Sequence, residues 1–386
     1  MENIKIKSLG PIKQADINFG DLTFFVGPQA SGKSILLQLI KLVSDKNAIE
    51  TRLENYGYVW GTNEDNNLER FFGEGMNGIW DEKSTEINVD GLPFTKSRLL
   101  PQKPGRKNEK KETVFYIPSQ RAICLESGWP RFFKDYEVSA PYVLRDFSET
   151  LRQYLDAGFS HGGSHVFPQD PGIFNGQLTD SFNESIFHMG KVTVELHVKK
   201  RLMLKINDMN LPFIVWSAGQ KEFMPLLLGF YWLCPPNKFR RNDLTTVIIE
   251  EPEMGLHPEA IKSVLLQIID LLQIGYKVIV SSHSPVLLEF AWAFNFLKES
   301  NAGDDSLLDL FGLQKEAENE TLLKGILHDK TIRTYFFENK DYKVSVKDIS
   351  SLDPGDEDSA VSEWGGLSSF ASKANHIVAT IAANNG

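Results

Sequence analysis

The chain has 386 residues, of which 41% are hydrophobic and 24% are charged, as is typical of a globular protein with a sizeable core. Acidic residues outnumber basic ones by 51 to 41, and the net charge of −10 argues against general binding to nucleic acid. Cys124 and Cys234 are the only cysteines, which gives neither a disulfide framework nor a zinc-binding pattern. The first residues lack a signal-peptide apolar region, and the longest apolar run, 223–234, is shorter than the roughly 20 residues that a membrane helix needs. We therefore expect a cytoplasmic protein with no membrane partner.

The N-terminal third begins with a predicted antiparallel pair of strands. Residues 4–6 and 15–19 alternate in polarity as half-buried strands do, and Gly10 and Pro11 form the turn between them. The apolar run 22–26 predicts a buried strand, and the run from residue 35 predicts a helix that ends near residue 43.

The segment between this strand and this helix fits the phosphate-loop pattern G-x-x-x-x-G-K-[ST]. Glycines let main-chain N–H groups curl around phosphate oxygens, and the helix N-terminus adds partial positive charge. Lys33 is expected to reach the β- and γ-phosphates, and the Ser34 hydroxyl to bind Mg²⁺. The candidate phosphate-binding residues are Gly27, Pro28, Gln29, Ala30, Ser31, Gly32, Lys33 and Ser34.

The middle of the chain is expected to hold an insertion and a helical lobe. Residues 46–111 are polar and irregular, with weak helical stretches, and a strand at 113–117 follows them. Residues 125–188 are aromatic-rich, with the clearest helical pattern at 147–155. Core packing is the favoured role for the aromatic side chains Trp129, Phe132, Phe133 and Tyr136.

Later segments predict a parallel sheet. Two strands are expected at 191–198 and 202–206, then a turn at 207–210 and a helix from 217 to 233 that contains Pro225. Buried strands at 245–249 and 277–280 flank a helix at 258–274, and strand–helix–strand units of this kind imply parallel strands. The residues beyond 300 predict an acidic, strand-poor extension that packs on the core.

Chemistry-bearing residues follow these later strands. Glu250 and Glu251 emerge at the C-terminal end of an apolar strand, where ligands bind in such sheets, and suit one metal ligand and one general base. His283 follows the next strand and could contact a γ-phosphate or have a structural role. The run Ser217-Ala218-Gly219-Gln220 predicts a helix-capping box, and a helix start of this kind could also face a phosphate.

The order and spacing of these pieces resemble the ABC-type ATPase heads of the RecF/SMC/OLD group. The resemblance implies an α/β fold of the P-loop NTPase, ABC-ATPase type, with a mixed and largely parallel core sheet, an antiparallel N-terminal sheet and a helical lobe. It also implies ATP and Mg²⁺ as ligands, and a head-to-tail dimer that sandwiches two ATP molecules.

The resemblance assigns roles residue by residue. Ser34 and Glu250 would hold Mg²⁺, with Gln120 as the Q-loop residue that contacts nucleotide and metal. Glu251 would be the catalytic base and His283 the contact to the γ-phosphate. The signature residues Ser217, Gly219 and Gln220 would bind nucleotide held by the partner copy. The chain departs from the group's pattern at Gln29, Glu250, Ala218 and His257.

Residues 1–300 are expected to form the ATPase domain, including the insertion 46–111 and the lobe 125–188, and residues 301–386 the C-terminal extension packed on it. A C-terminal Toprim nuclease is disfavoured, because the segments 335–341 and 356–358 are too close for a crossover unit, which leaves an edge strand and an acidic loop. A basic cluster offers a DNA or partner contact, although a solvated loop is favoured. Its members are Lys96, Arg98, Lys103, Arg106, Lys107, Lys110 and Lys111.

The favoured function is an ATP-hydrolysing sensor or scaffold that controls a separate effector, a toxin or nuclease from the same gene cluster, in bacterial anti-phage defence. One alternative is a RecF-like DNA-repair ATPase that clamps duplex DNA. Another is an ATP-dependent scaffold that hardly hydrolyses its nucleotide.

Overall fold

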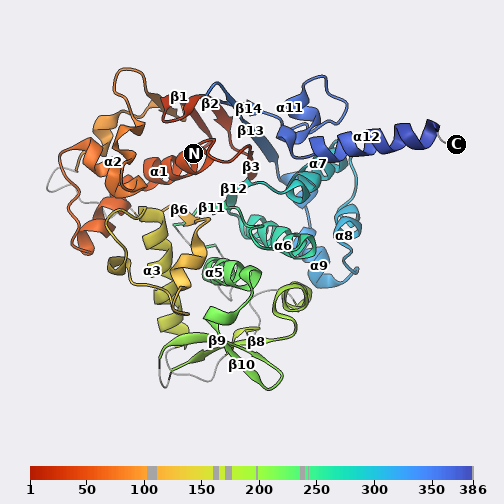
Figure 1. The fold of residues 1–386 in the computed structure, drawn as a ribbon, viewed down its shortest axis with the longest axis horizontal. Helices are drawn as coiled ribbons and strands as arrows, with labels where there is room; N and C mark the ends of the chain where they lie inside the picture. Colours follow the sequence, from red (N-terminus) through yellow and green to blue (C-terminus); the bar gives the residue numbers. More distant parts are fainter. Residues whose placement is uncertain are drawn as a thin grey trace.

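A ten-stranded mixed sheet organises the described part of the chain (Figure 1). The computed structural model describes residues 1–101, 111–159, 165–169, 176–196, 199–234, 240–241 and 243–384. The spatial order of the strands is β5-β4-β1-β2-β14-β13-β3-β12-β11-β6. Their bounds are β1 Asn3–Leu9, β2 Ile12–Asn18, β3 Leu22–Val26, β4 Glu86–Val89, β5 Leu92–Pro93, β6 Val114–Ile117, β11 Thr246–Glu250, β12 Lys277–Ser282, β13 Ile332–Lys340 and β14 Lys343–Asp348.

The two halves of the sheet differ in strand direction. β13, β3, β12, β11 and β6 are mutually parallel, whereas β1 pairs antiparallel with β2 and with β4. The predicted α/β class, with a parallel core and antiparallel N-terminal strands, is confirmed.

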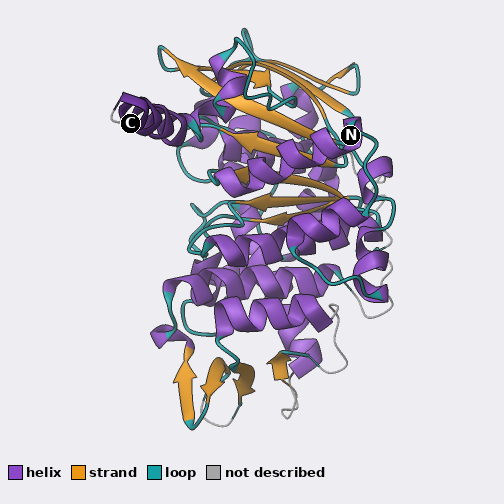
Figure 2. Cartoon of the chain, turned by 90° about the vertical axis from the view of Figure 1, so that its right-hand side faces the viewer, coloured by secondary structure: helices purple, strands orange, loops and turns teal. Residues whose placement is uncertain are grey.

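Helices cover both faces of the parallel half (Figure 2). Successive residues on one strand point to opposite faces, so Phe24 joins one apolar cluster while Phe25 joins the other. Strands buried on both faces read as continuous apolar runs, which is why these strands were visible in the sequence. The helices are α1 Lys33–Asn55, α2 Glu64–Phe72, α3 Tyr142–Phe159, α4 Gly176–Phe182, α5 Ala218–Leu233, α6 Pro258–Ile274, α7 Pro285–Glu299, α8 Asp305–Phe311, α9 Ala317–Leu323, α10 Ile326–Asp329, α11 Ser359–Ser362 and α12 Ser369–Asn384.

A small antiparallel sheet lies at the far end of the molecule from the antiparallel N-terminal strands (Figure 2). Its strands are β7 His165–Phe167, β8 Lys191–Glu195, β9 Arg201–Ile206 and β10 Met209–Pro212. The two strands expected at 191–198 and 202–206 correspond to β8 and β9, although residues 197 and 198 lie outside the described residues. The expected turn at 207–210 is shorter than predicted, because β10 begins at Met209.

The N-terminal insertion contains more regular structure than expected. Helix α1 does not end near residue 43 but kinks at Asp45, where φ is −121° and ψ is 16°, and continues to Asn55. The Asp45 carboxylate is buried and accepts hydrogen bonds from the N–H groups of Thr113 and Val114 at 2.8 and 2.9 Å. Farther along, β4 and β5 extend the main sheet beside β1. The expectation of an irregular segment at 46–111 is therefore wrong for these elements.

The C-terminal segment is part of the main sheet rather than a strand-poor extension. β13 lies between β3 and β14, pairing parallel with β3 and antiparallel with β14, so the edge strand expected at 335–341 is instead internal. β14 in turn pairs with β2 and joins the two halves of the sheet. The internal position of β13 was missed because its partner β3 is about 300 residues away in sequence, and no local pattern records that pairing. β14, which forms a local hairpin with β13, was not predicted.

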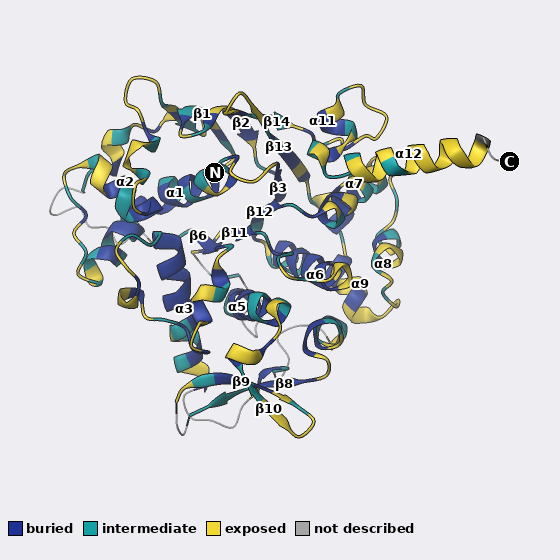
Figure 3. Cartoon of the chain, viewed as in Figure 1, coloured by how far each residue is buried: buried dark blue, intermediate teal, exposed yellow. Residues whose placement is uncertain are grey.

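Helix α12 departs from the expectation in the opposite direction. It projects from the body instead of packing on it, and its surface is exposed along its length (Figures 1 and 3). Apolar side chains gather at helical spacing, with exposed fractions of 84% for Phe370, 66% for Val378 and 55% for Ile381. No helix among the described residues is long and apolar enough to cross a membrane.

Removing residues 301–386 should prevent the protein from folding into a soluble monodisperse species, because β3 would lose β13 and expose an apolar edge. Removing only residues 369–386, as a control, should change the melting temperature by less than about 3 °C. Size-exclusion chromatography and thermal melts followed by circular dichroism measure both. A soluble, folded 1–300 fragment would instead support a domain boundary at residue 300.

Candidate active site

The C-terminal ends of four parallel strands meet along one edge of the sheet. Val26 of β3 pairs with Ser282 of β12, Ser281 pairs with Glu250 of β11, and Ile249 pairs with Ile117 of β6. The residues that follow these strands therefore lie side by side. This edge brings together the phosphate loop, the two glutamates, His283 and the segment that contains Gln120, at the place where α/β sheets bind ligands.

The phosphate loop has the backbone that its glycines permit. Gly27 has a φ of 145°, and a Cβ there would lie 2.8 Å from the carbonyl oxygen of Phe337 in β13. Gly32 is left-handed, with a φ of 86°, and caps the N-terminus of α1. The Lys33 ammonium donates to the carbonyl oxygens of Gly27 and Pro28 at 2.9 and 2.8 Å, which folds the side chain back over the loop.

Lys33 is the cation of this site, and its charge is poorly solvated. Burial lowers the pKa of Lys33 to about 8, although the carboxylates of Glu251, Glu250 and Glu253 oppose this shift. The ammonium is therefore close to losing its proton near neutral pH unless more negative charge arrives. Triphosphate oxygens would supply that charge.

Glu250 has the environment of a metal ligand. Its side chain is buried, and Oε2 accepts a hydrogen bond from the Ser119 N–H at 3.1 Å. Oε1 is buried without any hydrogen-bond partner. Burial raises the pKa of Glu250, while the nearby Ser34 hydroxyl lowers it. A hard cation held between Ser34 and Glu250 would satisfy the orphaned oxygen, so these residues fit Mg²⁺.

The described residues hold no group of three or more His, Cys, Asp or Glu side chains that could bind a metal by themselves. A magnesium ion here would thus depend on phosphate oxygens for most of its ligands, which is the usual arrangement for Mg²⁺ in nucleotide sites. Gln120, the third expected metal contact, lies exposed at the end of β6, next to Ser119.

Glu251 and His283 form a partly exposed pair beside the loop. His283 Nε2 lies 3.7 Å from Glu251 Oε1, and the side chains are 30% and 32% exposed. Glu251 has a φ of 44°, a left-handed backbone that is uncommon for a residue with a side chain. Its N–H donates to the Ser281 carbonyl at 2.9 Å. Uncommon backbone conformations of this kind cluster at functional sites.

Two residues that the sequence analysis did not choose complete the edge. Glu253 Oε1 accepts hydrogen bonds from the Ser282 hydroxyl at 2.8 Å and from the His283 N–H at 2.6 Å, which fixes the loop that carries the histidine. Arg121 is fully buried and donates to main-chain carbonyls around the site. Neither residue belongs to a sequence motif that could have identified it, because the partners of both are main-chain groups or hydroxyls distant in sequence.

The signature segment caps helix α5 as predicted. The Ser217 hydroxyl accepts from the Gln220 N–H at 3.3 Å, and the Gln220 side chain accepts from the Ser217 N–H at 3.1 Å. The Gln220 amide also donates to the Ile186 carbonyl at 3.0 Å and is buried, so its side chain serves the fold rather than facing a nucleotide. Ser217 itself is exposed. A Cβ on Gly219 would lie 2.6 Å from the Gly255 carbonyl oxygen, so this glycine allows a close approach within the same chain.

The basic cluster is only partly described, and its described members have partners. Lys96 and Lys111 form ion pairs with Asp65 at 2.7 Å and Asp243 at 2.9 Å. The Arg98 guanidinium lies 5.6 Å from the ring centre of Phe94. The other members, Lys103, Arg106, Lys107 and Lys110, lie outside the described residues.

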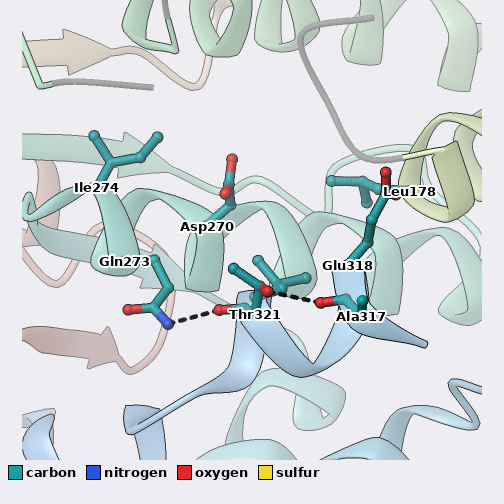
Figure 4. A pocket seen from close by; sticks show the side chains of 8 residues that line it. Leu178, Asp270, Gln273, Ile274, Ala317, Glu318 and Thr321 are labelled. Carbon is teal, nitrogen blue, oxygen red and sulfur yellow. Dashed lines mark hydrogen bonds between the residues drawn. The ribbon is translucent and has the colours of Figure 1, made fainter. Parts of the chain in front are cut away.

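A separate pocket of about 520 Å³ opens between α6 and α9 (Figure 4). The Gln273 amide donates to the Thr321 carbonyl at 3.1 Å and links the two helices along it. None of the candidate active-site residues lines this pocket. The lining residues are Leu178, Asp270, Gln273, Ile274, Ala317, Glu318, Thr321 and Leu322.

Residues 101–289 match a family described as "AAA domain, putative AbiEii toxin, Type IV TA system". The matched segment includes Glu250, Glu251, His283 and the Ser217 cap, and the phosphate loop precedes it. Over this segment the chain resembles the ABC-type ATPases. A resemblance to this P-loop ATPase family implies nucleotide binding, with Mg²⁺ as the typical metal.

The chain also resembles curated and solved proteins. A segment of 68 residues is 40% identical to the Old nuclease of Escherichia phage P2. This segment makes up 17% of this chain and 12% of that nuclease. The SMC head domain from Thermotoga maritima aligns over 90% of this chain and 98% of its own, with 12% identity and a TM-score of 0.37. The structure of an SmcHead bound to the C-winged helix domain of ScpA aligns over 90% of this chain and 96% of its own, with 13% identity and a TM-score of 0.41.

ATP affinity should fall as pH rises, because the free ATPase has Lys33 with a pKa of about 8 and only the protonated form attracts phosphate. At pH 9 about a tenth of Lys33 is charged, so affinity should be roughly tenfold weaker than at pH 7. The sign for stability is opposite: since folding depresses this pKa from 10.5, the contribution of Lys33 to stability rises as pH increases from about 8. Equilibrium titration with a fluorescent ATP analogue measures the affinity.

The control for this pH experiment is Lys33→Ala, which should bind weakly at both pH values with no such dependence. A wild-type affinity that stays constant between pH 7 and pH 9 would contradict the assigned role of Lys33.

Proposed function

We propose that this ABC-type ATPase hydrolyses ATP at the sheet edge and uses the resulting change of shape to control a separate effector. The observation that supports hydrolysis most directly is the pairing of Glu251 with His283 on the sheet edge that also carries the phosphate loop. Phosphoryl transfer to water commonly uses these three groups: a glycine-rich loop, a carboxylate that binds the metal, and a second carboxylate.

Each side chain has a distinct task in this proposal. The phosphate-loop N–H groups and Lys33 bind the triphosphate, while Ser34 and Glu250 hold Mg²⁺. When bound, Mg²⁺ supplies positive charge that stabilises negative charge on the phosphate oxygens. Glu251 accepts the proton of the attacking water, and His283, held by Glu253, contacts the transferred phosphoryl group.

The partner in hydrolysis is proposed to be a second copy of the chain. Ser217 is exposed at the N-terminus of the 16-residue helix α5, where unpaired N–H groups favour anions. In a head-to-tail dimer, Ser217 and Gly219 of one copy would close over the nucleotide bound by the other.

Glu251→Gln should lower ATP turnover by at least about a hundredfold, because the amide cannot accept the proton of the attacking water. ATP affinity should stay within about threefold of wild type, since Lys33 and Ser34 are unchanged. Phosphate-release kinetics and nucleotide titration measure the two quantities.

A matched control for Glu251→Gln is Glu259→Gln, the same chemical change on the exposed first turn of α6, where the carboxylate pairs only with Lys262. It should leave turnover unchanged. Wild-type turnover in Glu251→Gln would contradict the catalytic assignment. Wild-type turnover no faster than that of Lys33→Ala would favour the non-hydrolysing scaffold.

The separate effector is proposed from the family and from an exposed surface. The family description names a putative toxin and a type IV TA system, and we take this as the reason to expect a second component. Helix α12 offers a stripe of exposed apolar side chains, including Phe370, Val378 and Ile381, and such stripes commonly mark protein-binding surfaces. Anti-phage defence is the proposed setting, and a toxin or nuclease is the proposed partner.

Purification of the tagged ATPase from its native gene cluster, with ATP and Mg²⁺, should yield a second protein at fixed stoichiometry. Deleting residues 369–386 should remove that protein without reducing ATP turnover by more than about twofold. Mass analysis of the intact complex measures both stoichiometries. A complex that contains only this chain, or this chain with DNA, would contradict the effector proposal and favour the DNA-clamp alternative.

A further inference from the structure

Arg121 is fully buried behind the candidate active site and binds three segments at once. Its Nε donates to the carbonyl oxygen of Glu222 in α5 at 3.0 Å. Its Nη1 donates to the Glu250 carbonyl at 2.9 Å and, at the longer distance of 3.5 Å, to that of Pro118. Its Nη2 donates to the Glu251 carbonyl at 3.0 Å. A planar fork of fixed N–H directions is suited to this multiple binding, and an ammonium is not.

The contact to Glu251 holds an unusual piece of backbone. Glu251 has a left-handed φ of 44°, and both of its main-chain polar groups are occupied. Its N–H donates to the Ser281 carbonyl at 2.9 Å, and its carbonyl accepts from Arg121. The Glu251 carbonyl also accepts from the Met254 N–H at 3.1 Å. Together these bonds fix the direction in which the Glu251 side chain leaves the backbone. That direction places Oε1 3.7 Å from His283 Nε2.

The contact to Glu222 joins the same backbone to the signature helix. Glu222 lies near the start of α5, the helix that Ser217 caps. Gly219 of that helix also packs directly on Gly255, in the loop after β11. The start of α5 is thus attached to the end of β11 at two places, one through Arg121 and one through the two glycines. A displacement of α5 would be transmitted to the Glu251 peptide.

The segment that carries Arg121 also touches the metal-binding carboxylate. Ser119, two residues before Arg121, donates its N–H to Glu250 Oε2 at 3.1 Å. Exposed Gln120 lies between them. One short segment after β6 therefore contacts the carboxylate of Glu250, the backbone of Glu250 and Glu251, and helix α5.

We propose that Arg121 is a positioning residue that holds Glu251 in its hydrolytic orientation and ties that orientation to the signature helix α5. The inference rests on the proposed hydrolysis of ATP. Arg121 touches neither nucleotide nor metal in this scheme, and acts only through the peptides that it binds. Movement of α5 on dimer closure then reaches Glu251 through a direct hydrogen-bonded connection.

Arg121→Lys tests the proposal, because a lysine keeps the charge but loses the wide planar fork of donors that reaches the carbonyls of Glu222, Glu250 and Glu251 together. The turnover number should fall by about tenfold to a hundredfold, as expected when a reacting group is displaced by a fraction of a bond length. The KM for ATP should stay within about threefold. A role limited to folding would instead lower the melting temperature and reduce nucleotide binding together with turnover.

The matched control is Arg145→Lys, which replaces another buried arginine, stacked between Tyr58 and Phe133 and remote from the phosphate loop in its contacts. It should lower the melting temperature without changing the turnover number per folded protein. Adding Arg121→Lys to Glu251→Gln should not lower the residual rate further, because the two changes act through one carboxylate.

Turnover of Arg121→Lys within about twofold of wild type, or a further loss in the double variant, would overturn the inference. If Arg121→Lys does not fold, Gly255→Ala crowds the Gly219 backbone of α5 from the β11 loop, with Gly57→Ala, also left-handed but in open space, as its control. Gly255→Ala should lower the turnover number and leave ATP affinity unchanged, and wild-type turnover would overturn the proposal. A wild-type protein without turnover would contradict the proposed function itself, whereas turnover insensitive to Arg121 contradicts only the coupling.

Discussion

The register of the parallel strands β3, β12 and β11 is the constraint on which the site depends. Pairing of Val26 with Ser282 and of Ser281 with Glu250 brings three loops to one line. A slip of one residue would turn Phe24 and Phe25 toward the wrong apolar clusters, so burial on both faces of the sheet specifies this register strongly. Packing of the strands in the two apolar clusters therefore determines which side chains meet at the sheet edge.

Charge at the site is unbalanced in a way that fits its proposed ligand. Glu250, Glu251 and Glu253 all act on the charge of Lys33, and Arg121 is directed at main-chain carbonyls rather than at any carboxylate. A triphosphate alone would add further negative charge to this edge, so a divalent cation must accompany it. The orphaned Oε1 of Glu250 marks where that cation would bind. In the proposed function, metal and nucleotide would therefore bind together.

The sequence revealed those parts of the fold that local patterns determine. The phosphate loop, the Ser217 capping box and the helix from Pro258 to Ile274 agree with the structure, because each depends on residues within a few turns. Strand β13 was taken for an edge strand, since its pairing with β3 joins residues about 300 positions apart. Arg121 was passed over because its acceptors are carbonyl groups, which every residue carries.

The position of β13 also orders the events of synthesis. During translation, β3 and the phosphate loop emerge early, but their neighbour on one side, β13, begins only at Ile332. Until that strand arrives, Gly27 lacks the Phe337 backbone against which it packs. A nascent chain on the ribosome therefore carries a complete nucleotide-binding motif without a complete nucleotide-binding site. The nucleotide site is therefore completed only by a strand that lies about 300 residues later in the chain than the loop it supports.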